Sequence, residues 1–364
     1  MSDVQFIKKI FADYYRTAEI VIPAIEKREF GFGNRKKIDA RHLNFANLSE
    51  FRNYLTRNTP LFVSHSTAYY KYPGATPIQK KEWTCADIVF DLDIHAEGKY
   101  GAYALLEDMK NDLGRLIDDF IVNDFGISRE HVVTVFSGNR GYHVHVRDPA
   151  YLPLGGDERR ELVDYIMGQG LNYLDFFPTR DTKAKLVGPR PDEGGYRGRF
   201  ARQTIRTLNE NPVSISKIFN DQKRKEFFIR GIKEGNWSNM TLKFNDLLGR
   251  LKPIADTLPV ASVNTDVGVT QDLSKLIRVP NSIHGETGLV AKIVDDLDSF
   301  NPFRDAVLQG EPLKIKFTED VPEIPAVGTG KFKKEDEKEM PRHLALFFVL
   351  KGSAILLRPP QEPS

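Results

Sequence analysis

Two aspartates separated by one residue, Asp91 and Asp93, form the strongest candidate for chemistry in this sequence. Apolar residues occupy every second position from Ile88 to Ile94, which predicts a half-buried strand with both carboxylates on its polar face. Their Cα atoms would be roughly 6.5–7 Å apart, and two like charges so close favour a neutralising cation. Carboxylate oxygens suit Mg²⁺ or Mn²⁺, and such a pair can hold two metal ions about 3.5–4 Å apart for in-line phosphoryl transfer. The alternative is a pair of acids on a solvent-facing sheet surface.

A glycine-flanked turn, Ser137 to Gly141, is the second candidate site. It joins two predicted strands, His131–Phe136 and Tyr142–Arg147, and carries Arg140, with His143 just beyond it. Glycines let backbone N–H groups approach an anion, a guanidinium can grip a phosphate with two hydrogen bonds, and a histidine can donate to another oxygen. The pattern favours a triphosphate-binding turn over a plain hairpin with a solvated arginine.

A third segment, residues 272–285, is informative only beside the other two. Asp272 could supply a third metal ligand, and Arg278, Ser282 and His284 could contact phosphates. Acids before a leucine-rich segment are common, so a structural role is the simpler interpretation of this segment taken alone.

The elements that must position these residues are mixed in type. Helical spacing predicts amphipathic helices near the N-terminus and at Leu105–Ile121, a β-rich stretch reaches to about Lys81, and helices dominate from Asp157 to about Leu258. We therefore expect an α/β (α+β) fold in which a core of mixed sheets is interrupted by a helical insertion subdomain. The expected division is a catalytic domain at 1–155 and 259–310, a helical insertion at 156–258, and a C-terminal extension at 311–364 that packs on the core.

The composition fits a soluble, cytoplasmic protein, since no apolar run approaches the roughly 18 residues of a membrane helix. Cys85 is the single cysteine of the 364 residues, which excludes an intramolecular disulfide and a multi-cysteine zinc site. The net charge of +2 does not by itself identify a nucleic-acid binder. The densest basic cluster could track a template backbone or be a solvated loop; it comprises Arg180, Lys183, Lys185, Arg190, Arg197, Arg199, Arg202 and Arg206.

Taken together, the three motifs resemble the small, catalytic subunit of archaeal and eukaryotic-type DNA primases. The family signature is a D-x-D strand, here Phe90–Asp93, followed by S-G-x-R-G-x-H, here Ser137–His143. A later aspartate precedes an R-x-P-x-S-x-H segment, here Asp272 and Arg278–His284. The order and spacing match, and the resemblance extends from about residue 5 to about residue 308.

The resemblance implies a primase-type catalytic core and a DNA primase, a DNA-directed RNA polymerase that makes short RNA or DNA primers on a single-stranded DNA template. It implies that Asp91, Asp93 and Asp272 bind two metal ions, Mg²⁺ or Mn²⁺. The residues it implies for nucleotide binding are Ser137, Arg140, His143, His284, Arg278, Arg41 and Glu29. The implied partners are a primase large subunit in a heterodimer, the DNA template, and ribo- or deoxyribonucleoside triphosphates.

Two departures from the family pattern matter. Many relatives carry a cysteine-bound zinc between the first two motifs, whereas Ile94–Phe136 contains no cysteine, so we expect no structural zinc. Many relatives also carry a lysine two positions after the histidine of the third motif, where this chain has Glu286; Lys292 is the expected substitute.

Two alternatives share the fold. One is a primase-like repair polymerase, which would extend ends well but start chains poorly. The other is a non-catalytic single-strand-binding protein, against which the acidic triad argues, because clustered carboxylates hinder DNA binding unless they hold metal.

Overall fold

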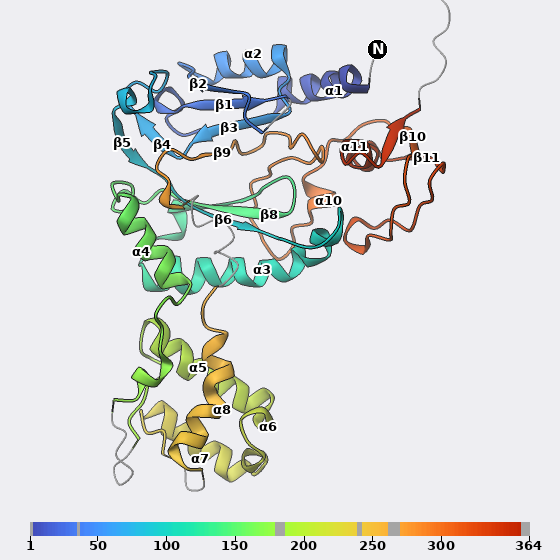
Figure 1. Ribbon diagram of the computed structural model, residues 1–364. Helices are drawn as coiled ribbons and strands as arrows, with labels where there is room; N and C mark the ends of the chain where they lie inside the picture. Colours follow the sequence, from blue (N-terminus) through green and yellow to red (C-terminus); the bar gives the residue numbers. More distant parts are fainter. Residues whose placement is uncertain (1–2, 35–36, 179–185, 239–241, 261–269, 358–364) are drawn as a thin grey trace, which may run out of the picture. The chain divides into compact units, whose positions relative to one another are not determined.

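A computed structural model describes residues 3–34, 37–178, 186–238, 242–260 and 270–357 of the chain (Figure 1). The chain forms two compact units. The first comprises Met1–Leu113, Ser128–Glu161 and Ser262–Ser364, and the second comprises Gly114–Ile127 and Leu162–Ala261. The mixture of helices and small antiparallel sheets confirms the α+β class predicted from the sequence.

One antiparallel sheet of the first unit has the strand order β2-β1-β3-β9. Its strands are β1 (Phe30–Gly33), β2 (Ala40–Leu43), β3 (Phe62–Ser66) and β9 (Leu276–Arg278). Strand β9 comes from the third motif and pairs with β3, Ser64 opposite Arg278. Helices α1 (Asp3–Thr17) and α2 (Leu48–Asn58) lie on one side of this sheet (Figure 1). Phe51 of α2 packs on Phe30 of β1, with ring centroids 4.8 Å apart. Both rings are buried in an aromatic cluster, which holds the helix against the sheet.

The second sheet has the order β6-β8-β7 and carries the first two motifs. Its strands are β6 (Ile88–Asp93), β7 (Val132–Phe136) and β8 (Gly141–Val146). The predicted alternation of β6 is confirmed, since Ile88, Phe90 and Leu92 are buried while the two aspartates are partly exposed. The register between β6 and β8 sets Asp91 opposite His143 and Asp93 opposite Gly141.

Shorter elements complete the first unit. They are strands β4 (Ala68–Tyr70) and β5 (Trp83–Ala86), helices α3 (Leu106–Arg115), α4 (Gly156–Ile166) and α10 (Pro302–Asp305), and the 3₁₀ turns η1 (Ile25–Lys27), η2 (Ile78–Lys81), η3 (Gly101–Leu105) and η5 (Arg129–His131). Both α3 and α4 continue into residues of the second unit.

The C-terminal stretch forms a third sheet, β11-β10-β12, within the first unit. It comprises β10 (Leu313–Phe317), the 3₁₀ turn η9 (Pro325–Val327), β11 (Glu337–Met340), helix α11 (Arg342–Leu350) and β12 (Ala354–Leu356). Helix α11 packs its aromatic face on η3, with ring centroids 5.2 Å apart between Tyr103 and Phe347. This packing brings the end of α11 close to the second motif.

The second unit is helical. Its elements are the π-helical segment η4 (Leu116–Asp124), η6 (Tyr173–Phe176), α5 (Gly195–Glu210), α6 (Pro212–Ile215), η7 (Lys217–Asn220), α7 (Gln222–Lys233) and α8 (Phe244–Asp256). Trp237 lies at the centre of its core, stacked 5.5 Å from Phe200 of α5. Within the described residues, no helix is both long enough and apolar enough to cross a bilayer.

Candidate active site

A pocket of about 280 Å³ in the first unit brings the three motifs together. Asp91 and Asp93 of strand β6 line the pocket, and so do all three residues of β9, Leu276–Arg278. The remaining predicted residues in its wall are Ser137, Arg140, His143 and His284, and the other lining residues include Lys37, Ser64, Asn139 and Lys275. Asp91 and His284, 193 positions apart in the sequence, thus share one cavity.

The two aspartates of β6 are paired with basic and imidazole groups. Arg140 donates from Nε to Oδ1 of Asp93 and from Nη2 to Oδ2, each at 3.1 Å. This fork raises the pKa of the guanidinium above its ordinary value. Across the strand pair, Nε2 of His143 lies 3.6 Å from Oδ1 of Asp91.

Both pocket histidines are neutral at physiological pH. Burial, assisted by the positive charge of Arg278, lowers the pKa of His143 to about 3. Burial also holds the pKa of His284 well below its usual range. Nδ1 of His284 accepts the backbone N–H of Glu286 at 3.2 Å, so the ring proton of the neutral form resides on Nε2 and is available as a donor.

The turn of the second motif packs directly on the turn of the third. Gly138 has φ 80°, and a Cβ added there would lie 2.9 Å from Cβ of His284. Thr287 Oγ1 donates to the carbonyl oxygen of Gly138 at 2.6 Å. This contact explains why Arg140 and His284 reach the same pocket.

Gly141 is required by the register of β6 and β8. A Cβ at this position would run into the carbonyl oxygen of Leu92 and lie 3.0 Å from Cα of Asp93. We expect Gly141→Ala to cost about 1–3 kcal/mol of stability through overpacking, and to impair catalysis further by displacing Asp93. Chemical denaturation and a synthesis assay measure the two effects.

Gly114→Ala is the matched control for that substitution. It lies in α3, where an added Cβ meets nothing within 4 Å, so the change should be neutral or stabilise by about 0.5–1 kcal/mol. Equal behaviour of the two variants would contradict the register argument.

Arg278 is a half-buried cation that lines the pocket. Burial lowers the pKa of its guanidinium to about 10, and Nη1 has no hydrogen-bond partner in the described part of the chain. A buried donor without a partner is costly. An anion in the pocket would relieve that cost.

Three predicted site residues do not line the pocket: Asp272, Arg41 and Glu29. Hydrogen bonds through Ser274 link them to one another. Glu29 is fully buried and accepts from Arg41 Nε at 2.9 Å and from Arg41 Nη2 at 3.4 Å. Arg41 also donates to the carbonyl oxygen of Ser274 at 3.3 Å. Ser274 in turn donates through its backbone N–H and its hydroxyl to Oδ1 of the exposed Asp272, at 2.8 and 2.7 Å. In this structure the Glu29–Arg41 pair fixes the turn that carries Asp272.

The carboxylates of the pocket are the groups that could hold a metal ion. No group of three or more histidine, cysteine, aspartate or glutamate side chains is arranged to hold a metal among the residues described. Asp91 and Asp93 nevertheless fit a divalent cation of the Mg²⁺ type, because they are 21% and 31% exposed, share one strand face and offer hard oxygen donors.

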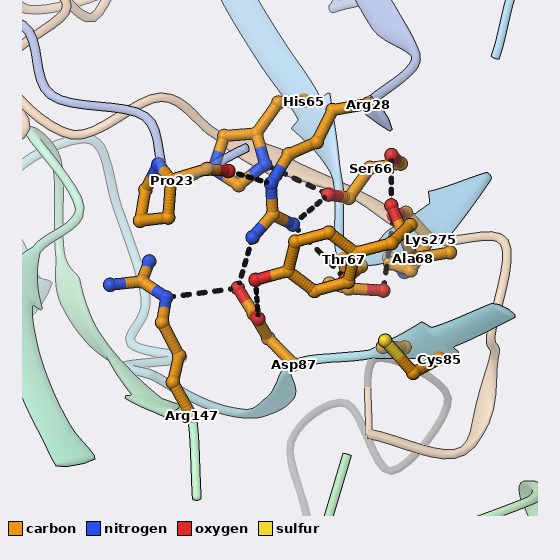
Figure 2. Close-up of polar contacts among 12 residues, drawn as sticks. Pro23, Arg28, His65, Ser66, Thr67, Ala68, Cys85, Asp87, Arg147 and Lys275 are labelled. Atoms are coloured by element: carbon orange, nitrogen blue, oxygen red, sulfur yellow. Dashed lines mark hydrogen bonds and ion pairs between the residues drawn. The ribbon is translucent and has the colours of Figure 1, made fainter. Parts of the chain in front are cut away.

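A buried network behind β6 was not foreseen from the sequence. Arg28 and Asp87 form a fully buried ion pair at 2.9 Å, and Arg28 also donates to the carbonyl oxygens of Ser66 and Thr67 (Figure 2). The same carboxylate oxygen, Oδ2 of Asp87, also accepts from Arg147 Nε at 3.2 Å. Burial acts to raise the pKa of Asp87, but Arg28 and Arg147 outweigh it and hold the pKa below its ordinary value. The network joins the segment before β1, the end of β3 and the residue before β6.

The described arginines of the basic cluster form ion pairs and hydrogen bonds within the second unit. Arg197 pairs with Glu193 at 2.6 Å, and the buried Arg199 pairs with Asp124 at 2.6 Å. Arg190 and Arg206 also pair with acids, and Arg202 donates to two backbone carbonyls. Arg180, Lys183 and Lys185 lie outside the described residues. The part at 195–206 is helix α5, so the solvated-loop interpretation was wrong there.

Comparison with known proteins agrees with the geometry. Residues 90–296 match the family model described as DNA primase small subunit. The chain is 33% identical to the DNA primase small subunit PriS of Methanococcoides burtonii, over 96% of this chain and 97% of that protein. It is 32% identical to PriS of Thermoplasma volcanium over the same shares, and 31% identical to PriS of Methanosarcina acetivorans over 96% of each chain. Because the match covers both motif-bearing sheets and nearly the full length, this chain belongs to the DNA primase small subunit family and is a primase catalytic subunit, a nucleotidyltransferase.

Proposed function

We propose that this chain joins nucleotides in the pocket of Asp91, Asp93, Arg140 and His284, making short primers on a single-stranded DNA template. The observation that carries the proposal is the arrangement of charge in this one cavity. Two carboxylates lie on β6, and cations and neutral donors from the other motifs surround them. A nucleoside triphosphate needs both, because its phosphates bind cations and its α-phosphorus must be activated for attack by a 3′-hydroxyl.

We assign the metal to the carboxylates of Asp91 and Asp93, with Asp272 as the third ligand. When bound, Mg²⁺ or Mn²⁺ would polarise the α-phosphate and stabilise the pyrophosphate leaving group. Arg140 holds Asp93 in its rotamer through the two-pronged contact and keeps its charge compensated. Glu29 and Arg41 fix the Asp272 turn through Ser274, which gives these two residues a positioning role beside the nucleotide site.

The triphosphate is bound by donors that the fold holds ready. His284 presents its Nε2 proton because Nδ1 is occupied, and Arg278 presents a buried Nη1 without a partner. Arg140, Ser137 and His143 complete the wall. Because these groups are preorganised, they cost little reorganisation when charge develops on the phosphates.

The proposed partner is a primase large subunit in a heterodimer; the relatives' designation as small subunits supports this. The proposed substrates are a single-stranded DNA template and nucleoside triphosphates of either sugar type.

Synthesis on an unprimed template tests this function. The heterodimer should make short chains on single-stranded DNA without a primer, given Mg²⁺ or Mn²⁺. Extension of supplied primers with no synthesis on unprimed DNA would favour the repair-polymerase alternative. DNA binding with neither activity would favour the single-strand-binding alternative.

Arg140→Ala and His284→Ala should each weaken nucleotide binding about tenfold to a hundredfold, because charge-assisted hydrogen bonds contribute roughly 1.5–3 kcal/mol each. If both residues bind one phosphate chain, the double variant should be non-additive. Nucleotide affinity of the wild type, both single variants and the double variant is the measurement, alongside affinity for single-stranded DNA. Losses confined to DNA binding, or strictly additive nucleotide effects, would count against a shared triphosphate site.

A further inference from the structure

Lys351 brings a positive charge from the C-terminal stretch next to Asn139, a residue of the pocket wall. It directly follows α11, well outside the family match at residues 90–296. Its ammonium donates to Oδ1 of Asn139 at 3.3 Å, and Asn139 lines the pocket next to Arg140. The hydroxyl of Tyr103 donates to the same Oδ1 at 2.8 Å. Asn139 therefore serves as a common acceptor that fixes the ammonium beside the second motif.

Among the described residues, the ammonium has cations and aromatic rings as neighbours and no paired acid. It lies 5.2 Å from the ring centroid of Tyr103 and 5.9 Å from that of Phe347. No carboxylate of the described chain lies within 4.0 Å of it. Burial lowers its pKa to about 8, an effect that Glu286 opposes and Arg140 reinforces. Holding a half-buried cation without a counter-ion costs free energy, and an incoming anion removes that cost.

The anion expected beside Lys351 is a nucleotide phosphate. The reason is that Arg140 and His284, which we assign to the triphosphate, line the pocket whose wall includes Asn139. The positive charge of Lys351 also lowers the pKa of His284, whose Nε2 proton we assign to the triphosphate. Two positions after this histidine the chain carries the exposed Glu286, so the third motif offers no cation there. Lys292, the substitute expected from the sequence, is exposed and acts on Asp305.

We propose that Lys351 binds the phosphates of the incoming nucleotide, supplying a cation that the third motif lacks beside His284. The C-terminal stretch thereby completes the active site of this chain. This proposal rests on the proposed function, since it assumes that the triphosphate occupies the pocket.

Lys351→Met tests the proposal, because methionine keeps the unbranched stem and removes the charge. We expect nucleotide affinity to fall about tenfold or more, as for the loss of a charge-assisted contact, with single-stranded DNA affinity and thermal stability close to wild type. Lys314→Met is the matched control, since Lys314 belongs to the same stretch but is 68% exposed on β10. It should leave nucleotide affinity unchanged.

A second substitution separates phosphate binding from a role in docking α11. Glu286→Lys places a cation two positions after His284 and leaves the backbone N–H that donates to His284 intact. In the Lys351→Met background it should recover a large part of the lost nucleotide affinity. Wild-type nucleotide affinity in Lys351→Met would overturn the proposal, and so would a loss that tracks reduced thermal stability and is not recovered by Glu286→Lys.

Arg140→Ala distinguishes failure of this proposal from failure of the proposed function. If Arg140→Ala weakens nucleotide binding and Lys351→Met does not, the pocket assignment stands and Lys351 has no phosphate role. If neither change affects nucleotide binding, the triphosphate does not occupy this pocket and both proposals are wrong.

Discussion

Replacing Asp91 or Asp93 by alanine is expected to reduce nucleotide incorporation by at least about 10³-fold, because loss of a metal ligand removes several kcal/mol of charge stabilisation from the transition state. The fold should persist, since both side chains are partly exposed and lie on the polar face of β6. Incorporation by the heterodimer on a primed template, with Mg²⁺ and with Mn²⁺, is the measurement.

Glu97→Ala is the control for these variants. Glu97 is an exposed carboxylate in the loop four positions after Asp93, and its removal should leave incorporation near the wild-type rate. Near-normal incorporation by Asp91→Ala or Asp93→Ala would reject the two-metal assignment.

Arg28→Ala is expected to have the largest effect on stability, a loss of about 3–5 kcal/mol, because it leaves the buried Asp87 without its closest cation (Figure 2). Activity should also fall, since Asp87 directly precedes β6, the strand that carries Asp91 and Asp93. Denaturant unfolding near pH 7 measures the stability. By contrast, Arg16→Ala breaks only the exposed pair with Asp13 and should change stability by less than about 1 kcal/mol.

The pH dependence of the Arg28 variant follows from the depressed pKa of Asp87. In the wild type this carboxylate contributes stability that is fully present above its ordinary pKa and is lost as pH falls through the lower folded value. The deficit of Arg28→Ala should therefore shrink at acidic pH. A cost below 1 kcal/mol at pH 7, or a deficit that grows on acidification, would contradict the role given to this pair.

Sequence patterns of a few residues predicted those parts of the site that depend on residues adjacent in the sequence. The alternation from Ile88 to Ile94 placed Asp91 and Asp93 on the polar face, since burial of one face fixes a strand with period two. The turn at Ser137–Gly141 was likewise visible, because glycines permit its backbone conformation and β-forming residues flank it.

The prediction that the stretch before Lys81 is β-rich missed a helix. It contains α2, capped by the side chain of Asn47, which accepts from the backbone N–H of Glu50. Phe51 and Leu55 are four positions apart and both buried, a helical spacing that the surrounding strand-forming residues obscured.

Contacts between distant residues could not be read from spacing. The pairing of Arg28 with Asp87 joins positions 59 apart, and it requires β1 and β3 to assemble behind β6. The fit of Gly138 against His284 depends on two turns meeting in three dimensions. Lys351 lies outside the motifs altogether, and only the packing of α11 on Tyr103 brings it to the pocket.

The measurement that tests the central claim most directly is the metal dependence of nucleotide affinity in a variant with both Asp91→Asn and Asp93→Asn. Asparagine preserves the shape of each side chain but removes the charge that holds a divalent cation. In the wild type, Mn²⁺ should strengthen nucleotide binding. In the variant the Mn²⁺ effect should disappear, while binding through Arg140 and His284 persists. An undiminished Mn²⁺ effect in the variant would show that the metal and the triphosphate meet elsewhere.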